Sequence, residues 1–239
     1  MSTLFKIILA NVFVSLFSLV GIIFVSVKEK LLDKILLWLV SFASGALIGV
    51  AFLHMIPRSI ENNSKAIYFV VLGIVVFFLL EKFFYWRHCH EQKCEVHSFA
   101  YLNLIGDSFH NFIDGMVIAG SFVTDVNLGI ITTLAVIVHE IPQELGDFGV
   151  LVHGGFNKKK ALTLNFLTAL FAVAGGIVGF IFTEKISFIR LNLVPFTAGG
   201  FIYVSLVDLV PELHRRFSLK ESFVQLLLVI SGISIFALL

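Results

Sequence analysis

The sequence predicts an all-α integral membrane protein with eight transmembrane helices, and three observations support this prediction. Of the 239 residues, 58% are hydrophobic and only 14% are charged, whereas soluble domains carry about 25% charged residues. The mean hydropathy is +0.99. Apolar runs long enough to cross the ~30 Å hydrocarbon core of a bilayer recur along the whole chain. The expected spans are residues 3–27, 33–57, 66–86, 99–122, 127–153, 160–183, 193–213 and 219–238.

These spans use most of the chain, so we expect a single transmembrane domain over residues 1–239. No room is left for a soluble catalytic domain, and the net charge of +1 excludes the strongly basic surface of a nucleic-acid-binding protein. The first span might be taken for a signal peptide, but its apolar run is longer than a signal h-region and no small-residue cleavage site precedes Lys28. We therefore expect a true first span.

Lys and Arg are distributed unequally between the two sides of the predicted bundle. Twelve of the seventeen follow the first, third, fifth and seventh spans, and five lie on the opposite side. The positive-inside rule places the richer side in the cytoplasm and both termini outside. The compact length favours a prokaryotic cytoplasmic membrane. The twelve are Lys28, Lys30, Lys34, Lys82, Arg87, Lys93, Lys158, Lys159, Lys160, Arg215, Arg216 and Lys220.

The second and seventh spans repeat one pattern in opposite directions. FASGALIGVAFLHMIP and FTAGGFIYVSLVDLVP match at a constant offset of 154 residues, with His54 aligned to Asp208. Inverted repeats are frequent in secondary transporters. The pattern predicts a 3+2+3 arrangement, in which spans 1–3 and 6–8 are inverted halves around spans 4 and 5; a chance match between apolar helices is the alternative. The identical pairs are Phe42 and Phe196, Gly45 and Gly199, Ile48 and Ile202, Val50 and Val204, and Pro57 and Pro211.

Ionisable residues gather in the two central spans. In the fourth span, His110 and Asp114 are four residues apart and share one helix face. In the fifth, the stretch HEIPQELGDF places His139 and Glu140 near the bilayer midplane. A charge at that depth costs at least about 2.5–3.5 kcal/mol, and no Lys or Arg near the midplane could neutralise these groups. We expect a bound cation to do so; protonated packing or internal pairing is the alternative.

The residue types in this cluster indicate a transition metal. Imidazole nitrogen together with carboxylate oxygen is the ligand set of Zn²⁺ and its first-row neighbours. Pro142 removes one backbone hydrogen bond and frees the carbonyl of Val138, next to His139. The candidate metal ligands are His110, Asn111, Asp114, His139, Glu140, Gln143 and Glu144.

Other polar residues are candidates for a pathway on either side. Asn165 and Thr168 in the sixth span are expected to hydrogen-bond between helices; a role as oxygen ligands is the alternative. The segment 87–98 is expected to be a flexible cytoplasmic loop that collects metal, since His and Cys are concentrated there; a folded zinc site is the alternative. The pathway candidates are His54, Asp107, Asp147, Asp208 and Glu212, and the loop candidates are His88, Cys89, His90, Cys94 and His97.

Four motifs resemble those of the ZIP family of zinc and iron transporters. They are HNFIDG and HEIPQELGDF in the central spans, with ALIGVAFLHMIP and AGGFIYVSLVDLVPELH in the second and seventh spans. The likeness covers most of the chain and is greatest to the branch that carries HNFxDG and HExPHExGDF. The resemblance implies a non-enzymatic carrier, usually a homodimer, that moves Zn²⁺ into the cytoplasm, or Fe²⁺, Mn²⁺ or Cd²⁺. The metal is its substrate, and no separate cofactor is implied.

One position departs from the motif of this branch. Gln143 stands where the branch has a second histidine and where other members have a glutamate. A neutral amide is a weaker and harder ligand than either residue. The substitution therefore argues against a bridged two-metal centre and favours a shift from zinc toward iron or manganese.

Two rival functions use the same residues. HEIPQ resembles the HExxH helix of zinc proteases, with Glu140 as general base, but Gln143 replaces the second histidine and Pro142 sits inside the required turn. A metal sensor that binds without transport is the other rival. The inverted repeat argues against it, because a sensor needs no symmetric inward and outward states.

Overall fold

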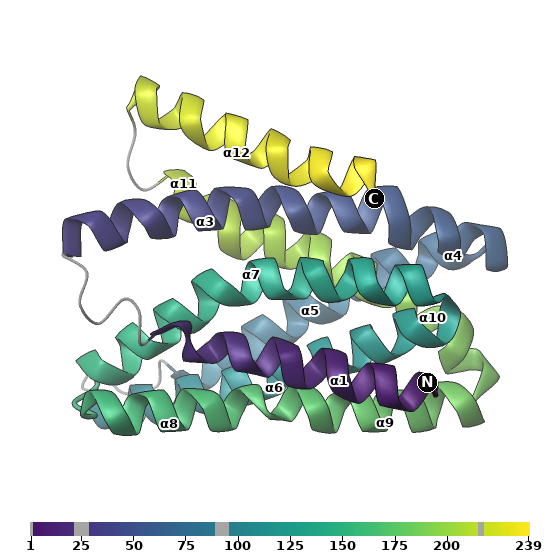
Figure 1. Cartoon of the computed structure of the whole chain (residues 1–239), viewed down its shortest axis with the longest axis horizontal. Coiled ribbons are helices and arrows are strands. Elements are labelled where there is room, and N and C mark those ends of the chain that lie inside the picture. Colours follow the sequence, from purple (N-terminus) through teal and green to yellow (C-terminus); the bar gives the residue numbers. More distant parts are fainter. Residues whose placement is uncertain (1, 22–28, 89–95, 215–217) are drawn as a thin grey trace.

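The computed structural model describes residues 2–21, 29–88, 96–214 and 218–239, and every regular element in these ranges is helical. The helices lie side by side along the longest axis of the molecule (Figure 1). In chain order they are α1 (Thr3–Leu16), η1 (Phe17–Val20), α3 (Glu29–Val50), η2 (Ala51–Met55), α4 (Ile56–Asn62), α5 (Ala66–His88), α6 (Val96–Thr124), α7 (Val126–His153), α8 (Lys158–Ala169), α9 (Phe171–Lys185), α10 (Ser187–Tyr203), η3 (Val204–Leu209), α11 (Val210–His214) and α12 (Leu219–Leu238).

Seven helical stretches among the described residues are long and apolar enough to cross a membrane. They correspond to every expected span except the fourth. That span is α6, which has 29 residues but carries His110, Asn111, Asp107 and Asp114 in its middle. These polar side chains lower its mean hydropathy. The seven stretches are Thr3–Val20, Lys34–Asn62, Ala66–Phe83, Val126–His153, Lys158–Lys185, Ser187–His214 and Leu219–Leu238.

Several helices extend beyond the expected spans. The second span continues through Pro57 to Asn62, five residues beyond its expected end, because Pro57 stands in the first turn of α4, where a missing N–H is tolerated. The expected loop 87–98 is shorter, since α5 extends to His88 and α6 begins at Val96. Residues 89–95 lie outside the described ranges.

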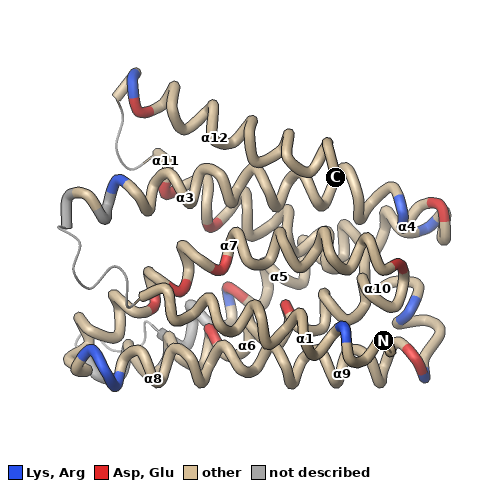
Figure 2. Tube along the Cα trace, viewed as in Figure 1, with Lys and Arg blue, Asp and Glu red and all other residues tan. Residues whose placement is uncertain are grey.

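The helices pack in pairs around α6 and α7. α6 packs against α9 and α7, α3 packs against α12, and α10 packs against α5. α3 also packs against α7, which links the outer pair to the centre. Lys and Arg lie toward the helix ends, whereas Asp and Glu also occur along the middle of α7 (Figure 2). The fold therefore holds acidic groups within the bundle and leaves basic groups near its two ends.

Two outer helix pairs are in contact through glycines at equivalent positions. A Cβ added to Gly45 on α3 would lie 2.1 Å from the Val229 carbonyl oxygen on α12. A Cβ added to Gly199 on α10 would lie 2.0 Å from the Val70 carbonyl oxygen on α5. No side chain fits at either position, so backbone meets backbone. Gly45 and Gly199 are one of the residue pairs separated by 154 positions.

Two π-helical turns occupy equivalent positions as well. η2 interrupts the stretch Lys34–Asn62 shortly before Pro57, and η3 interrupts the stretch Ser187–His214 shortly before Pro211. π-helix is rare and appears mostly as single turns at functional sites. His54 lies in η2 and Asp208 lies in η3.

Candidate metal centre

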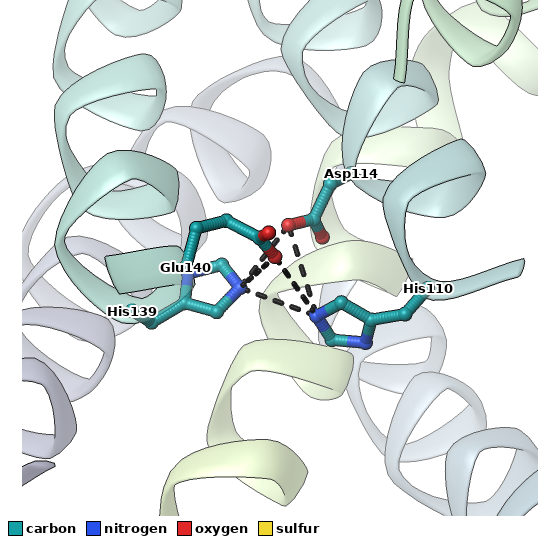
Figure 3. A group of neighbouring side chains, drawn as sticks. All are labelled: His110, Asp114, His139 and Glu140. Atoms are coloured by element: carbon teal, nitrogen blue, oxygen red, sulfur yellow. Dashed lines mark hydrogen bonds and ion pairs between the residues drawn. The ribbon is translucent and has the colours of Figure 1, made fainter. Parts of the chain in front are cut away.

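Four side chains from two helices meet inside the bundle (Figure 3). His110 and Asp114 come from α6, and His139 and Glu140 come from α7. Each offers one ligand atom, and these four atoms all lie within 4.8 Å of one another. The arrangement has the size and donor set of a metal site.

The atoms are close enough to share one ion. His139 Nε2 lies 3.1 Å from Asp114 Oδ2 and 3.3 Å from His110 Nε2. Glu140 Oε1 lies 3.4 Å from His110 Nε2 and 3.5 Å from His139 Nε2. Ligands held about 2 Å from a common Zn²⁺ are separated by about 3.3 Å in a tetrahedron, so little movement would be needed.

Helix geometry explains why these residues converge. His110 and Asp114 are one turn apart on α6, and His139 and Glu140 are consecutive on α7. Asp125 joins the two helices: its side chain caps α7 by accepting a hydrogen bond from the Leu128 N–H at 3.0 Å. Because a single residue connects α6 to α7, the two helices run antiparallel. Their middle residues, which include His110 and His139, therefore lie at the same height along the bundle.

The site is buried, and two of its carboxylate oxygens lack a well-formed hydrogen bond. The side chains of His139 and Glu140 are each 2% exposed and that of Asp114 is 4% exposed, whereas His110 is 21% exposed. Among the described residues, Asp114 Oδ2 and Glu140 Oε1 have no hydrogen-bond partner. Imidazole nitrogens lie 3.1 to 3.5 Å from these two oxygens, and a cation held between the four side chains would satisfy both oxygens fully.

Two neighbours orient the imidazole of His139. Its Nδ1 lies 3.2 Å from the Ala135 carbonyl oxygen one turn earlier on α7. Its ring meets the ring of Phe201, on α10, edge to face at 5.8 Å. An Nδ1–H bond to a carbonyl leaves Nε2 free for a metal. Sequence reasoning missed Phe201, which looks like any apolar residue of a buried helix.

The other candidate ligands lie around this group. Asn111 is fully buried, and its Nδ2 donates to Asp107 Oδ1 at 2.9 Å. Glu144 is outside the four-residue group and accepts a hydrogen bond from Asn165 on α8. Gln143 is half-buried, one turn beyond His139 on α7.

The pathway candidates lie at three places. His54 contacts the Phe236 carbonyl oxygen and lines a cavity of about 290 Å³ together with Arg58 and Asp125. Asp208 is exposed in η3, and Glu212 is half-buried on α11. Asp107 and Asp147 lie on α6 and α7, one to two turns from the four-residue group.

The loop candidates are described only in part. His88 is the last residue of α5 and His97 lies in the first turn of α6. Cys89, His90 and Cys94 lie outside the described residues.

A partner of Asp147 was also missed. Asn103 Nδ2, on α6, donates to Asp147 Oδ1 at 2.8 Å. The signal was present, since Asn103, Asp107 and Asn111 follow one another at four-residue spacing on one face of α6.

Comparison with known proteins gives consistent similarities. A family model described as ZIP Zinc transporter matches residues 3–98 and 86–239. The chain is 34% identical to Zinc transporter ZIP13 from Pongo abelii, over 84% of this chain and 65% of that protein. It is 31% identical to Zinc transporter zipt-7.1 from Caenorhabditis briggsae, over 82% of this chain and 68% of that protein. It is 30% identical to Zinc transporter ZIP13 from Homo sapiens, over 84% of this chain and 69% of that protein. The chain thus spans about two-thirds of the length of these relatives.

Proposed function

This chain belongs to the ZIP zinc transporter family, and on that premise we propose that it carries a divalent metal ion, Zn²⁺ first among them, across a membrane through a site shared by α6 and α7. The proposed ligands are His110, Asp114, His139 and Glu140. The direction proposed is into the cytoplasm.

One observation supports the site above all others. Two imidazole nitrogens and two carboxylate oxygens lie within 4.8 Å of one another, and two of the buried oxygens have no hydrogen bond. None of the buried side chains among the described residues is a Lys or Arg that could neutralise the acids. A first-row divalent ion matches both the charge and the donor atoms.

We propose that the remaining ligand candidates lie next to the four proposed ligands and assist metal binding or passage. Gln143 is one turn from His139, and we propose that its amide oxygen approaches the ion during transport. Asn111 adjoins His110 and holds Asp107. The His and Cys residues of segment 87–98 are proposed to collect metal on the cytoplasmic side.

We also propose the eight-span arrangement in one domain, with α6 as the fourth span and α1–α5 and α8–α12 as inverted halves. The paired π turns and the paired glycine contacts at matching positions support it. The distribution of Lys and Arg supports termini on the outer side. The homodimer and the prokaryotic cytoplasmic membrane stay predictions; the relatives named above are animal proteins.

The rival functions fit less well. The family is one of transporters, and Gln143 in place of the second histidine of HExxH removes a ligand that a zinc protease needs. A sensor would account for the site but not for the repeated π turns.

The experiment is metal uptake into proteoliposomes loaded with a fluorescent chelator. Zn²⁺, Fe²⁺, Mn²⁺ and Cd²⁺ are compared for the parent and for His139→Ala. We expect saturable Zn²⁺ flux in the parent and its loss in the variant. Flux unchanged in His139→Ala would refute the site, and metal binding without flux under an imposed gradient would refute transport.

A further inference from the structure

The helices fall into two groups by their contacts. α3, α4, α5, α10 and α12 pack mainly with one another, and so do α1, α6, α7, α8 and α9. Glycine brings backbone against backbone within the second group too, since a Cβ added to Gly115 on α6 would lie 1.9 Å from the Ala172 carbonyl oxygen on α9. Between the groups, a Cβ added to Gly120 on α6 would instead meet the side chain of Leu193 on α10. At these positions, backbones approach more closely within a group than across the boundary.

Side-chain hydrogen bonds also join helices of the same group. In the first group, the Ser44 and Ser205 hydroxyls bond at 2.9 Å, and Asn63 donates to Asn192 Oδ1 at 2.9 Å. In the second group, the Ser15 hydroxyl of α1 donates to the Ala169 carbonyl oxygen of α8 at 2.7 Å. These bonds strengthen each group without fastening one to the other.

Arg58 and Asp125 form an ion pair that crosses from one group to the other. Arg58 lies on α4, and its Nη2 is 3.6 Å from Oδ1 of Asp125, the residue between α6 and α7. The same Oδ1 accepts the hydrogen bond from the Leu128 N–H that caps α7. The ion pair thus fastens α4 to the tip of the α6–α7 hairpin, which carries the four proposed metal ligands.

A cavity of about 290 Å³ lies beside this ion pair. Residues of η2 and α4 line one wall, and residues at the start of α7 line the other. Packing between the two groups is interrupted at the cavity, so the charges of Arg58 and Asp125 attract each other across it. His54 and Glu61 line the cavity from the first group, and Asn127 and Ile131 line it from the second.

The ion pair has the strength of a contact that can break and re-form. The side chains of Arg58 and Asp125 are 45% and 34% exposed. Water screens an exposed pair, so its loss shifts an equilibrium by only about 2- to 5-fold. A fully buried pair would hold the two groups together much more firmly, because separating it leaves uncompensated buried charge.

We propose that Arg58 and Asp125 form an ion-pair latch, which holds α4 against the α6–α7 hairpin in this structure and opens in each transport cycle. The latch lies on the side that the proposed topology places outside. This proposal rests on the proposed transport function and adds a contact that controls the separation of α4 from the helices that carry the metal ligands.

The first test is a reversible crosslink across the latch. In the full chain with Cys89 and Cys94 changed to serine, Arg58→Cys with Asp125→Cys is treated in proteoliposomes with a short bis-methanethiosulfonate, and Zn²⁺ uptake is measured. We expect uptake to be lost on crosslinking and to return on reduction. A monofunctional methanethiosulfonate on the same variant is expected to leave uptake in place, which separates crosslinking from modification.

The matched control crosslinks two residues of one group. Asn63→Cys with Asn192→Cys joins side chains that already share a hydrogen bond within the first group. The same reagent is expected to leave Zn²⁺ uptake unchanged in this variant. Equal loss of uptake in both variants would overturn the assignment of the effect to the latch.

The second test measures separation without transport. Nitroxide labels on Lys65→Cys and Val126→Cys, both exposed, report the distance between the end of α4 and the start of α7 by double electron–electron resonance. Arg58→Gln or Asp125→Asn is expected to raise the population at longer distance about 2- to 5-fold; Asn also caps helices, so α7 keeps its cap. The double variant is expected to show no further rise, because the same contact is already lost. Glu61→Gln, which removes the pair within α4, is expected to match the parent.

The proposal is overturned if the chain crosslinked between positions 58 and 125 takes up Zn²⁺ like the parent, or if Arg58→Gln and Asp125→Asn leave the distances unchanged. These outcomes are distinct from failure of the proposed function. A shift in distance in a protein that shows no flux before crosslinking would overturn transport alone, and flux through the crosslinked chain would overturn the latch alone.

Discussion

His139 is fixed by neighbours on three helices. The Ala135 carbonyl of its own helix holds Nδ1, the Phe201 ring of α10 meets the imidazole, and Asp114 of α6 faces Nε2. The orientation of one imidazole thus links the central pair of helices to α10.

Phe201→Ala tests this link. Without the ring, His139 can turn away from the metal, so we expect the KM for Zn²⁺ uptake to rise about 10-fold while maximal flux changes less. Phe122→Ala is the matched control, since Phe122 is also buried and packs against Gly129. Equal effects of the two substitutions on KM would show that Phe201 only fills space; Phe201→Tyr is expected to restore the parental KM.

Gln143→His tests the preference for metal. An imidazole one turn beyond His139 adds a softer ligand, so the ratio of Zn²⁺ to Mn²⁺ affinity should rise about 10-fold or more. The measurement is competition between the two ions for uptake. Gln225→His, at a buried glutamine on α12, is expected to leave the ratio unchanged. A fall in the ratio in Gln143→His would contradict the ligand position given to Gln143.

At the scale of helices, pairing depends on close backbone contact. Gly45 lets α3 meet α12, and Gly199 lets α10 meet α5, with space for hydrogen alone. Membrane helices lack a hydrophobic force between them, so such small-residue contacts supply the packing. The exposed apolar faces of α5 and α12 are left for lipid.

Gly45→Ala is therefore expected to lower the melting temperature of the purified protein, since its Cβ would lie 2.1 Å from the Val229 carbonyl oxygen. Gly149→Ala has nothing within 4 Å of the new Cβ and should leave the melting temperature unchanged or raise it. Differential scanning fluorimetry compares them. A Gly45→Ala protein as stable as the parent would mean that α3 and α12 separate at no cost.

For the whole molecule, most of the bundle could be predicted from the sequence, because the length of an apolar run and the spacing of polar residues along a helix are local properties of the chain. Seven of the expected spans meet the length and hydropathy of membrane helices, and His110, Asp114, His139 and Glu140 converge as their helical spacing suggests. The π turns were not foreseen, since no residue type marks an extra residue in a helix. The interhelix hydrogen bond expected of Asn165 is confirmed, since its amide donates to Glu144 on α7, whereas the bond from Asn103 to Asp147 was not foreseen.

Membrane orientation gives a prediction for the molecule as a whole. In a chain with Cys89 and Cys94 changed to serine, a cysteine at Ser2 should react with an impermeant maleimide added outside intact cells. A cysteine at Lys159 should react only after permeabilisation, because the Lys-rich side is predicted to be cytoplasmic. The reverse pattern would invert the proposed topology.

The paired π turns have a consequence for which length changes the protein tolerates. Each turn holds one residue more than an α turn, so deleting one residue from η2 would restore an unbroken α-helix. Because the π turn takes up the extra residue within one turn, the helix beyond the deletion would stay in phase, and Pro57 and Arg58 would keep the face that they occupy. Single-residue deletions in η2 or η3 are therefore expected to preserve the facing of α4 or α11, whereas the same deletion in a regular α-helical turn would rotate the following segment by about 100°.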